Sequence, residues 1–331
     1  MKILLTGATG YVGHELALAL ANQGNQVHIL VRNLFSKNIP SHNNIIVFSG
    51  DITDRESICK AMTGCSQVYH TAAIVRIFAK DPSVFYKVNA KGTHNLLAEA
   101  LDLGVKKFVY TSTCGVIGST VKYPKNENDP RTESFDNDYE FTKYLGENLV
   151  KEYSHKGLFT VIVSLSKVFG PGIETHSISI NQVIDKFIKG KLTFVPKPGN
   201  ICSNYCFIND IVKGHIQAMQ YGLGGEKYIL GGVNISYDTL FKELRTLSGS
   251  KAKLIHIPKY IVKLLALLDW CKYLLTKTEP FVTAKGVHHI FINKEYDNKK
   301  AIQNIHYQPT PFSEALKQTI HFLKTKQHVN Q

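Results

Sequence analysis

The first thirteen residues restrict the possible folds more than any other part of the chain. They contain an apolar run that ends at Thr6, three glycines in the spacing Gly7-x-x-Gly10-x-x-Gly13, and the start of a helical pattern. This order of strand, glycine turn and helix is typical of dinucleotide-binding folds, because the turn lets a pyrophosphate approach the helix amino terminus. The residues expected to contact the dinucleotide here are Gly7, Thr9, Gly10, Tyr11, Val12 and Gly13.

The amino-terminal half alternates short β-branched runs with segments of helical periodicity. The expected strands are 2–6, 26–31, 44–48, 67–71, 107–113 and 159–165. The expected helices are 12–23, 55–62, 82–103 and 137–153. Such alternation builds right-handed β-α-β units, because parallel strands need a crossover connection. The sequence therefore predicts an α/β, doubly wound parallel-sheet Rossmann fold.

The pattern becomes less regular after residue 170, and a chain of 331 residues is long enough for two domains. Residues 1–170 are the predicted NAD(P)-binding domain. Residues 171–331 are mainly a smaller mixed α/β substrate-binding domain, from which 201–230 partly returns to the Rossmann core. This half is expected to contain strands 227–230 and 253–256, helices 180–189, 210–221, 236–247, 259–275 and 311–323, and a frayed tail at 325–331.

The composition excludes several classes of protein. Hydrophobic residues make up 44% of the chain and charged residues 20%, as in ordinary folded proteins. The net charge of +13 comes from scattered lysines rather than a clustered basic patch, so no nucleic-acid partner is expected. The six cysteines show no metal-ligand spacing, which predicts no metal site and a reducing compartment. The apolar start is too short for a signal peptide, so the expected location is cytoplasmic.

The longest apolar stretch, residues 261–275, has two interpretations. It is interrupted by Lys263, Asp269 and Lys272 and falls short of the ~20 residues of a spanning helix, so no transmembrane segment is expected. One interpretation is a helix that covers an apolar substrate pocket. The other is peripheral membrane contact, because Trp270, Tyr273 and the lysines suit a helix at a lipid interface.

The end of the second expected strand bears on the choice between NAD and NADP. An acidic residue about twenty positions after the glycine turn would select the free 2′-hydroxyl of NAD, and none is present. The cation of Arg32, assisted by Lys37, favours the 2′-phosphate of NADP, with NAD as the alternative cofactor. Asp51 and Ile52 follow the third strand and are expected at the adenine. Capping of the next helix is the alternative role for Asp51.

Tyr139 and Lys143 are four residues apart on an expected helix, so both side chains project from one face. A phenol becomes a usable acid or base near neutral pH when an ammonium group and a cationic nicotinamide stabilise its phenolate. Thr113 ends a hydroxyl-rich run at the carboxyl end of the fifth strand, the edge at which ligands of parallel sheets bind. These three residues form the expected catalytic group, with Ser112 as the alternative to Thr113.

Taken in order, these segments resemble the extended short-chain dehydrogenases/reductases of the NAD-dependent epimerase/dehydratase type. The motifs that carry the resemblance are the glycine turn, Asp51-Ile52, His70-Thr71-Ala72-Ala73, Val88-Asn89-x-x-Gly92-Thr93-x-Asn95-Leu96-Leu97, Tyr139-x-x-x-Lys143 and Val168-Phe169-Gly170-Pro171-Gly172. Arg32 and segment 227–232 look most like the dihydroflavonol-4-reductase-like branch, which also resembles the 3β-hydroxysteroid dehydrogenases.

The resemblance implies a role for each motif residue. Tyr139 would exchange a proton with the substrate oxygen, Lys143 would hold the nicotinamide ribose, and Thr113 would orient the same oxygen. Asn89 is similar to a family asparagine that stabilises the active-site backbone, or else is an ordinary buried asparagine. A homodimer is an expectation from the same resemblance. Further cofactor contacts are expected at Thr71, Ala72, Ala73 and Val168.

Three functions are compatible with these residues. The leading one is reversible reduction of a ketone or aldehyde, in a small and fairly apolar molecule, by hydride transfer with Tyr139 as proton donor. The alternative is epimerisation or dehydration of a nucleotide sugar with tightly bound NAD(P). Against it stand the missing acidic NAD selector and the single arginine after residue 131, since arginine grips diphosphate best. The third is a non-catalytic NADP-binding protein, whose expected mark is loss of the tyrosine or lysine.

Overall fold

A computed structural model describes the chain except for residues 77, 176–178, 281–282 and 330–331. Its centre is a seven-stranded sheet in the order β10-β6-β5-β4-β1-β2-β3, and all its strands pair in parallel. The strands are β1 (Lys2–Thr6), β2 (Gln26–Val31), β3 (Ile45–Ser49), β4 (Gln67–His70), β5 (Lys107–Thr113), β6 (Thr160–Leu165) and β10 (Lys227–Leu230). The predicted strands of the amino-terminal half are confirmed to within one residue at each end.

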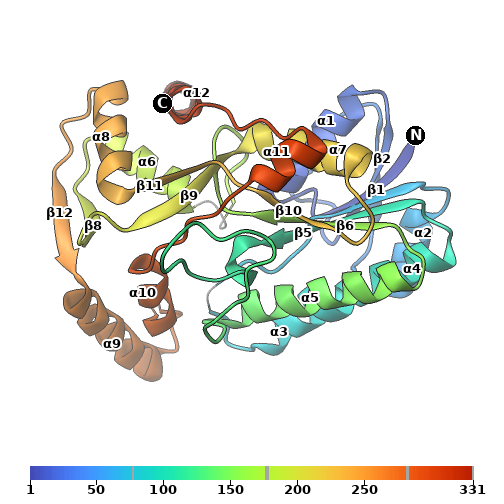
Figure 1. Cartoon of the computed structure of the whole chain (residues 1–331), viewed down its shortest axis with the longest axis horizontal. Coiled ribbons are helices and arrows are strands. Elements are labelled where there is room, and N and C mark those ends of the chain that lie inside the picture. The colour runs from blue at the N-terminus through green and yellow to red at the C-terminus, as the bar shows by residue number, and fades with distance from the viewer. Residues whose placement is uncertain (77, 176–178, 281–282, 330–331) are drawn as a thin grey trace.

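Helices cover both faces of this sheet (Figure 1). One face carries α1 (Tyr11–Asn22) and α7 (Ile208–Tyr221), which pack against each other. The other carries α2 (Arg55–Met62), α4 (Thr93–Asp102) and α5 (Asp138–His155), packed side by side. Separate buried apolar clusters fill the two layers. The predicted α/β, doubly wound parallel-sheet fold is therefore confirmed.

The segment predicted as one helix over 82–103 is instead divided in three. A short turn, α3 (Ser83–Phe85), continues into the π-helical segment η1 (Tyr86–Gly92) before α4 begins. Thr93 Oγ1 donates to the Asn89 carbonyl oxygen at 2.7 Å within this region. A Cβ atom at Gly92 would lie 2.7 Å from the Ile52 side chain, so the π-helical turn brings its backbone close to the segment that follows β3. Such π-helical turns are frequent next to functional sites.

The carboxyl-terminal half contains two small sheets that the sequence did not predict in full. β7 (Lys167–Phe169), β9 (Cys202–Phe207) and β11 (Val233–Ser236) form one, and β8 (Thr193–Lys197) pairs with β12 (Leu254–Pro258) in the other. These strands are short and lack a regular alternation, so periodicity does not reveal them. The helices of this half are α6 (Ser179–Ile188), α8 (Tyr237–Ser248), α9 (Lys259–Thr276), α10 (Ala284–Ile290), α11 (Lys299–Ile305) and α12 (Phe312–Val329).

The predicted frayed tail from residue 325 is wrong as far as Val329, because α12 continues through it. The helix is anchored upstream by the buried side chains of Leu316 and Ile320. An ion pair of 2.9 Å between Lys326 and Glu174 ties its last turns to the rest of the protein. The last two residues of the predicted tail lie outside the described part of the chain.

The edge strand β10 shows how the two halves of the chain are joined. It pairs with β6 in parallel, from Lys227 opposite Ile162 to Leu230 opposite Leu165. β9, which precedes it, belongs to the small mixed sheet. Within 201–230, therefore, β10 extends the large sheet and α7 packs on one of its faces, whereas β9 belongs to the small sheet.

The helix α9 lies at the periphery of the molecule (Figure 1). Ala266 is the only buried residue among its eighteen. It is not long and apolar enough to cross a bilayer, and the same is true of every other helix in the described part of the chain.

Candidate active site

The glycine turn between β1 and α1 is pressed against the end of β4. Gly7 has a positive φ of 84°, which favours glycine, and a Cβ atom there would lie 2.6 Å from the Ala72 nitrogen. At Gly13, a Cβ atom would lie 2.2 Å from the Gly7 carbonyl oxygen. Thr71 Oγ1 donates to the Thr6 carbonyl oxygen at 2.7 Å and holds the two strand ends together. The turn therefore keeps its backbone exposed at the helix amino terminus, as a pyrophosphate requires.

A single cavity of about 1390 Å³ runs along the carboxyl edge of the sheet. It exceeds the ~300–1,000 Å³ of sites for drug-sized ligands, which suits a dinucleotide together with a substrate. The structure brings all the predicted site residues to its wall. These are Gly7, Thr9, Gly10, Tyr11, Val12, Gly13, Arg32, Lys37, Asp51, Ile52, Thr71, Ala72, Ala73, Thr113, Tyr139, Lys143 and Val168.

The turn that follows Val168 is fastened over the glycine turn. Tyr11 donates from its hydroxyl to the Gly170 carbonyl oxygen at 2.8 Å. Asn181 binds both backbone groups of Gly170, at 3.1 Å to the nitrogen and 2.7 Å to the oxygen. A Cβ atom at Gly172 would lie 2.6 Å from the Tyr11 ring. Val168 is thereby held at the cavity wall by contacts with α1 and α6.

At the end of β2, Arg32 is exposed and lines the cavity, and it forms no ion pair among the described residues. Asp51 lines the cavity too, and its Oδ1 accepts 2.8 Å hydrogen bonds from the nitrogen and the hydroxyl of Thr53. The cap of α2 is Asp54, which accepts from the backbone nitrogens of Glu56 and Ser57. The alternative role of Asp51 as helix cap is therefore wrong.

Tyr139 and Lys143 lie on the face of α5 that borders the cavity, as their spacing predicted. Thr113 Oγ1 accepts a hydrogen bond from the Gly115 nitrogen at 3.1 Å, so its own proton remains available for a further hydrogen bond. Burial raises the pKa of Tyr139 to about 12, and the neighbouring Thr113 hydroxyl acts in the opposite direction.

Lys143 is buried, and its ammonium lies 3.9 Å from the centre of the Tyr110 ring. Burial lowers the pKa of Lys143 to about 7, although Glu147 acts in the opposite direction. The expected acidification of the Tyr139 phenol by this ammonium is therefore not produced by the protein's own groups. Desolvation penalises both charged forms and is the largest influence on each pKa.

A buried hydrogen-bonded group below the cavity was not foreseen from the sequence. Glu147 accepts from Ser112 Oγ at 2.5 Å and from Lys227 Nζ at 2.8 Å. The Ser112 hydroxyl is thus occupied by Glu147, whereas Thr113 Oγ1 accepts from the Gly115 nitrogen and keeps its proton available. The one signal in the sequence was spacing, because Glu147 follows Lys143 by four residues and so shares its face of α5.

Comparison with known proteins identifies the family. A model of the "NAD dependent epimerase/dehydratase family" matches residues 3–231, well over half of the chain. The chain belongs to this family. Individual relatives match this chain over most of its length.

Two curated relatives are similar over most of the epimerase/dehydratase-family chain. A putative dihydroflavonol 4-reductase of Synechocystis is 29% identical, over 98% of this chain and 95% of its own length. Sterol demethylase protein B of Methylococcus capsulatus is 30% identical, over 81% of each chain. Among solved structures, the crystal structure of gox2253 is 28% identical and superimposes with a TM-score of 0.82, over 98% of both chains.

Asn89 fixes the backbone next to the active site of this family member. The Asn89 side chain accepts from the Ile74 nitrogen at 2.8 Å and donates to the Ile74 oxygen at 3.2 Å. It also donates to Thr142 Oγ1 on α5 at 3.1 Å. Because Ile74 lines the cavity, this buried asparagine joins the loop after β4 to the helix that carries Tyr139.

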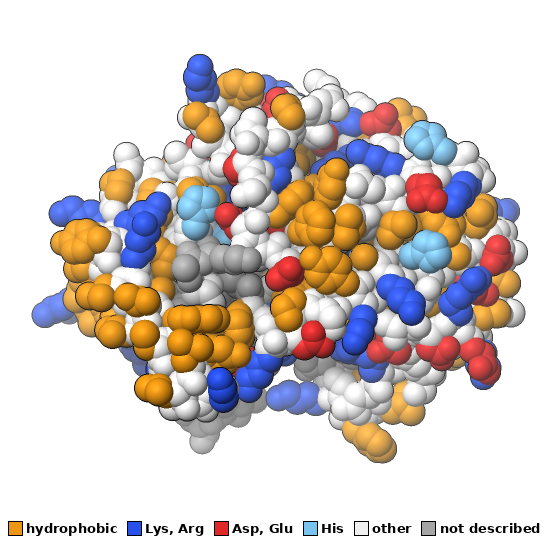
Figure 2. All heavy atoms as spheres, turned by 90° about the horizontal axis from the view of Figure 1, so that it is seen from below, with side chains coloured by type: hydrophobic (Ala, Val, Ile, Leu, Met, Phe, Trp, Pro, Cys, Tyr) orange, Lys and Arg blue, Asp and Glu red, His pale blue; other side chains and the backbone are white. Residues whose placement is uncertain are grey.

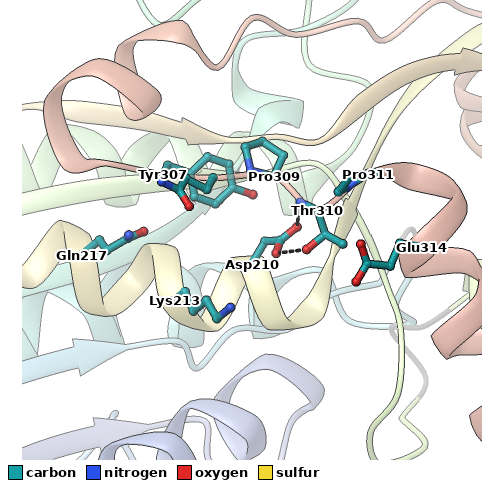
Figure 3. A pocket seen from close by; sticks show the side chains of 9 residues that line it. Asp210, Lys213, Gln217, Tyr307, Pro309, Thr310, Pro311 and Glu314 are labelled. Atoms are coloured by element: carbon teal, nitrogen blue, oxygen red, sulfur yellow. Dashed lines mark hydrogen bonds between the residues drawn. The ribbon is translucent and has the colours of Figure 1, made fainter.

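A second, smaller cavity of about 280 Å³ lies between α7 and the start of α12 (Figure 3). Asp210 accepts hydrogen bonds there from the nitrogen and the hydroxyl of Thr310, at 2.7 and 2.6 Å. None of the predicted site residues lines it. The Asp210 carboxylate joins α7 to the carboxyl-terminal segment through these hydrogen bonds, so we assign this cavity a structural role.

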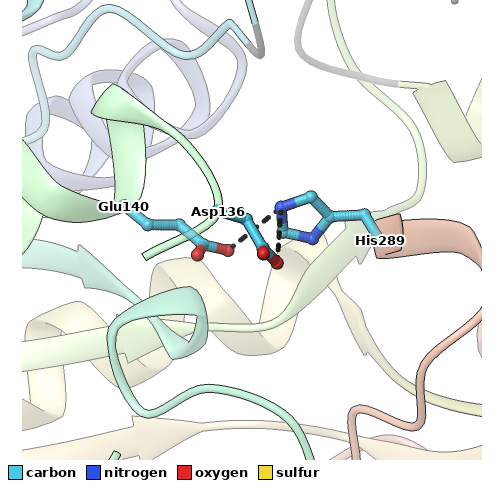
Figure 4. Close-up of side chains that lie close together, drawn as sticks. All are labelled: Asp136, Glu140 and His289. Carbon is cyan, nitrogen blue, oxygen red and sulfur yellow. Dashed lines mark ion pairs between the residues drawn. The ribbon is translucent and has the colours of Figure 1, made fainter. Parts of the chain in front are cut away.

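One group of three side chains is close enough to share a cation, although no metal site was predicted. Asp136, Glu140 and His289 approach one another beside the start of α5 (Figure 4). Glu140 is already paired with Arg131 at 3.2 Å and lies 3.5 Å from Lys294. Burial lowers the pKa of His289 to about 4, so its ring stays neutral. The protein's own cations thus balance the carboxylates of this cluster.

Proposed function

We propose that this protein is an NADP-dependent oxidoreductase that reversibly reduces a ketone or aldehyde, in a small and fairly apolar molecule, to the alcohol. The observation that carries the proposal is that Thr113, Tyr139 and Lys143 line the same cavity as the glycine turn. When bound, NADPH supplies the hydride that the carbonyl carbon accepts. Residues of this chain then need only deliver a proton and position the carbonyl oxygen.

The proton comes from Tyr139. The Tyr139 phenol is protonated at neutral pH, because burial raises its pKa to about 12. With substrate bound, Thr113 donates a hydrogen bond to the carbonyl oxygen and so stabilises the alkoxide that develops there. Lys143 binds the cofactor ribose, and the negative charge of the cofactor favours its ammonium form in spite of burial.

Two observations support NADP over NAD. Arg32 lines the cavity with its guanidinium free of any ion pair among the described residues, and β2 ends without a carboxylate. Lys37 lies on the same wall. Arginine binds phosphate in a two-pronged geometry that the 2′-phosphate satisfies.

The apolar character of the substrate is inferred from the cavity and from relatives. Ile74, Val75, Ile173 and Ile180 contribute apolar side chains to its wall. The names of the relatives, a dihydroflavonol reductase and a sterol demethylase protein, describe enzymes of apolar molecules. Arg245, the only arginine after residue 131, donates to the Ala252 oxygen and does not line the cavity, which weakens the nucleotide-sugar alternative.

Two further expectations stay predictions. All six cysteines are free thiols, which supports a reducing compartment such as the cytoplasm. The homodimer that the family resemblance implies is the second.

The decisive experiment follows NADPH oxidation with a panel of apolar ketones and aldehydes. We expect Tyr139→Phe to lose turnover by roughly 10²–10⁴-fold while it binds NADPH normally, because only the donated proton is removed. Thr113→Ser should retain most activity, and Thr113→Val should not. Conversion of nucleotide sugars without net change of NADPH would replace this proposal with epimerisation. Tight NADPH binding with no turnover of either class would indicate a non-catalytic protein.

A further inference from the structure

Lys167 is a cation of the cavity wall that belongs neither to the predicted cofactor contacts nor to the catalytic group. It begins β7, two residues after Leu165, which lies opposite Thr113 in the pairing of β6 with β5. Both Lys167 and Tyr139 line the cavity. The lysine therefore stands at the substrate end of the site rather than at the adenine end marked by Arg32.

The surroundings of Lys167 are unusual for an ammonium group. Its Nζ donates to Ser203 Oγ at 2.8 Å and lies 5.5 and 5.4 Å from the ring centres of Tyr205 and Tyr237. No carboxylate pairs with it among the described residues, in contrast to Lys227, which pairs with Glu147. Burial lowers the pKa of Lys167 to about 8.

A partly buried cation without a counter-ion is costly, and such groups concentrate at functional sites. One hydroxyl and two ring faces satisfy only part of the hydrogen-bonding capacity of an ammonium. An anion that enters the cavity would supply the missing charge. The cofactor's 2′-phosphate is assigned to Arg32 and Lys37, at the other end of the site.

We propose that Lys167 binds an anionic group, a carboxylate or a phosphate, on the otherwise apolar substrate. This inference rests on the proposed function, because it names the substrate class of the same site. Tyr205 and Tyr237 shield the ion pair from water and so strengthen it. The preferred substrates are then keto acids or keto phosphates rather than neutral ketones.

The test measures binding rather than turnover, so it can succeed even if the reductase proposal fails. The probes are 2-naphthoate, 2-naphthyl phosphate and the neutral 2-naphthamide, titrated by calorimetry into the NADP-loaded full-length protein. We expect one of the anions to bind at least about tenfold more tightly than the amide, as for a hydrogen bond between charged groups. Whichever anion binds more tightly identifies the carboxylate or the phosphate as the ligand.

Lys167→Met should reduce this preference to about onefold, and Lys167→Arg should retain part of it. The matched control is Lys251→Met, because Lys251 is exposed and does not line the cavity. Equal binding of anions and amide by the wild type would overturn the proposal. So would an unchanged preference in Lys167→Met. If the wild type shows the anion preference but turns over no carbonyl compound, only the reductase proposal is overturned.

A different observation, independent of the site, concerns the outer surface of α9. Six large apolar side chains of this helix are more than half exposed, namely Tyr260, Leu264, Leu267, Leu268, Leu274 and Leu275. The face seen in Figure 2 shows hydrophobic side chains gathered beside basic side chains. Lys263 and Lys272 are exposed on the same helix. No residue of α9 lines the large cavity, so the interpretation as a pocket cover is not supported.

Aromatic contacts join α9 to a segment that borders the cavity. Trp270 and Tyr273 of α9 pack edge-on against Phe78, with ring centres 6.3 and 5.5 Å apart. Phe78 belongs to the segment after β4, in which Ile74 and Val75 line the cavity.

We propose that α9 lies on the surface of an anionic phospholipid bilayer. Its leucines supply apolar area, and its exposed lysines, together with the net charge of +13, complement anionic headgroups. The same charge opposes docking of a second copy on this face. Membrane contact at α9 does not require any particular reaction in the cavity.

Flotation of the full-length protein with phosphatidylcholine vesicles, with and without phosphatidylglycerol, tests this. We expect binding to increase several-fold with phosphatidylglycerol and to decline with added salt. Leu264→Asp combined with Leu268→Asp should reduce binding at least about tenfold, whereas Leu223→Asp, at an exposed leucine before β10, should not. Absence of binding, or equal binding by the α9 variant, would overturn the proposal. So would a dimer in sedimentation that the α9 variant abolishes.

Discussion

Lys227 and Glu147 form a buried ion pair, with Lys227 Nζ 2.8 Å from Glu147 Oε2, that joins the edge strand β10 to α5. Both residues are less than 10% exposed. Tyr139, Lys143 and Glu147 follow one another at intervals of four residues, so the pair fixes the helix face that carries the catalytic phenol. A contact between distant parts of the chain thus sets the position of the proposed proton donor.

Removal of one partner from this ion pair should be strongly destabilising. We expect Lys227→Met to reduce the free energy of unfolding in urea by about 3–5 kcal/mol, because Glu147 is left buried and unpaired. The double variant Lys227→Met with Glu147→Leu should recover much of that loss. If the two single effects simply add in the double variant, the pair has no special energetic coupling.

Gly13→Ala should abolish cofactor binding. The new methyl group would lie 2.2 Å from the Gly7 carbonyl oxygen, and backbone atoms cannot move aside cheaply. We expect the Kd for NADPH, measured by fluorescence titration, to rise by more than ~10-fold as the turn is displaced. Gly224→Ala is the control, because its Cβ would meet only the Phe159 ring at 3.3 Å. Unchanged binding in Gly13→Ala would show that the cofactor does not rest on this turn.

Arg32→Ala should alter the choice of cofactor rather than the strength of binding in general. Loss of one charged hydrogen-bonding partner predicts a decrease of roughly 10–100-fold in affinity for NADPH. The affinity for NADH should hardly change, because NADH has no 2′-phosphate. Arg55→Ala provides a matched control, since Arg55 pairs with Glu99 and Asp102 away from the cavity. Equal losses for both cofactors would contradict the assignment of Arg32.

Lys143 should make the stability of the cofactor-free protein depend on pH. Its pKa is lowered from 10.5 to about 7 on folding, so the unfolded chain binds more protons between these values. The stability of the wild type should therefore rise with pH across this window, relative to Lys143→Met. Urea denaturation of both proteins at pH 7 and pH 9.5 measures the difference, and the shift of Lys167 is common to both. A difference that is constant with pH would show that Lys143 is not desolvated.

The sequence predicted the large sheet and its site well for one physical reason. Parallel strands end at a common edge, so motifs that follow β1, β2, β4 and β5 must converge there even when they are far apart in the chain. The local pattern at each strand end was therefore sufficient to place the cavity residues. No knowledge of contacts between distant segments was needed.

What the sequence could not predict depends on such contacts. Glu147 and Lys227 are eighty residues apart, and only the pairing of β10 with β6 brings them together. The direction of the pKa shift at Tyr139 depends on burial, which motif spacing does not reveal. The apolar stretch 261–275 likewise indicated a pocket cover or an interfacial helix, without showing that nearly all of α9 faces outward.

The placement of β10 at the edge of the large sheet has a consequence for biosynthesis. While the ribosome extends the chain past β6, that strand has an unpaired backbone edge, and Glu147 lacks its lysine. An open strand edge is prone to pair with other chains, so the nascent amino-terminal half is exposed to aggregation until β10 emerges. Fragments that stop before Lys227 should consequently require chaperones, even though they contain every motif of the nucleotide site.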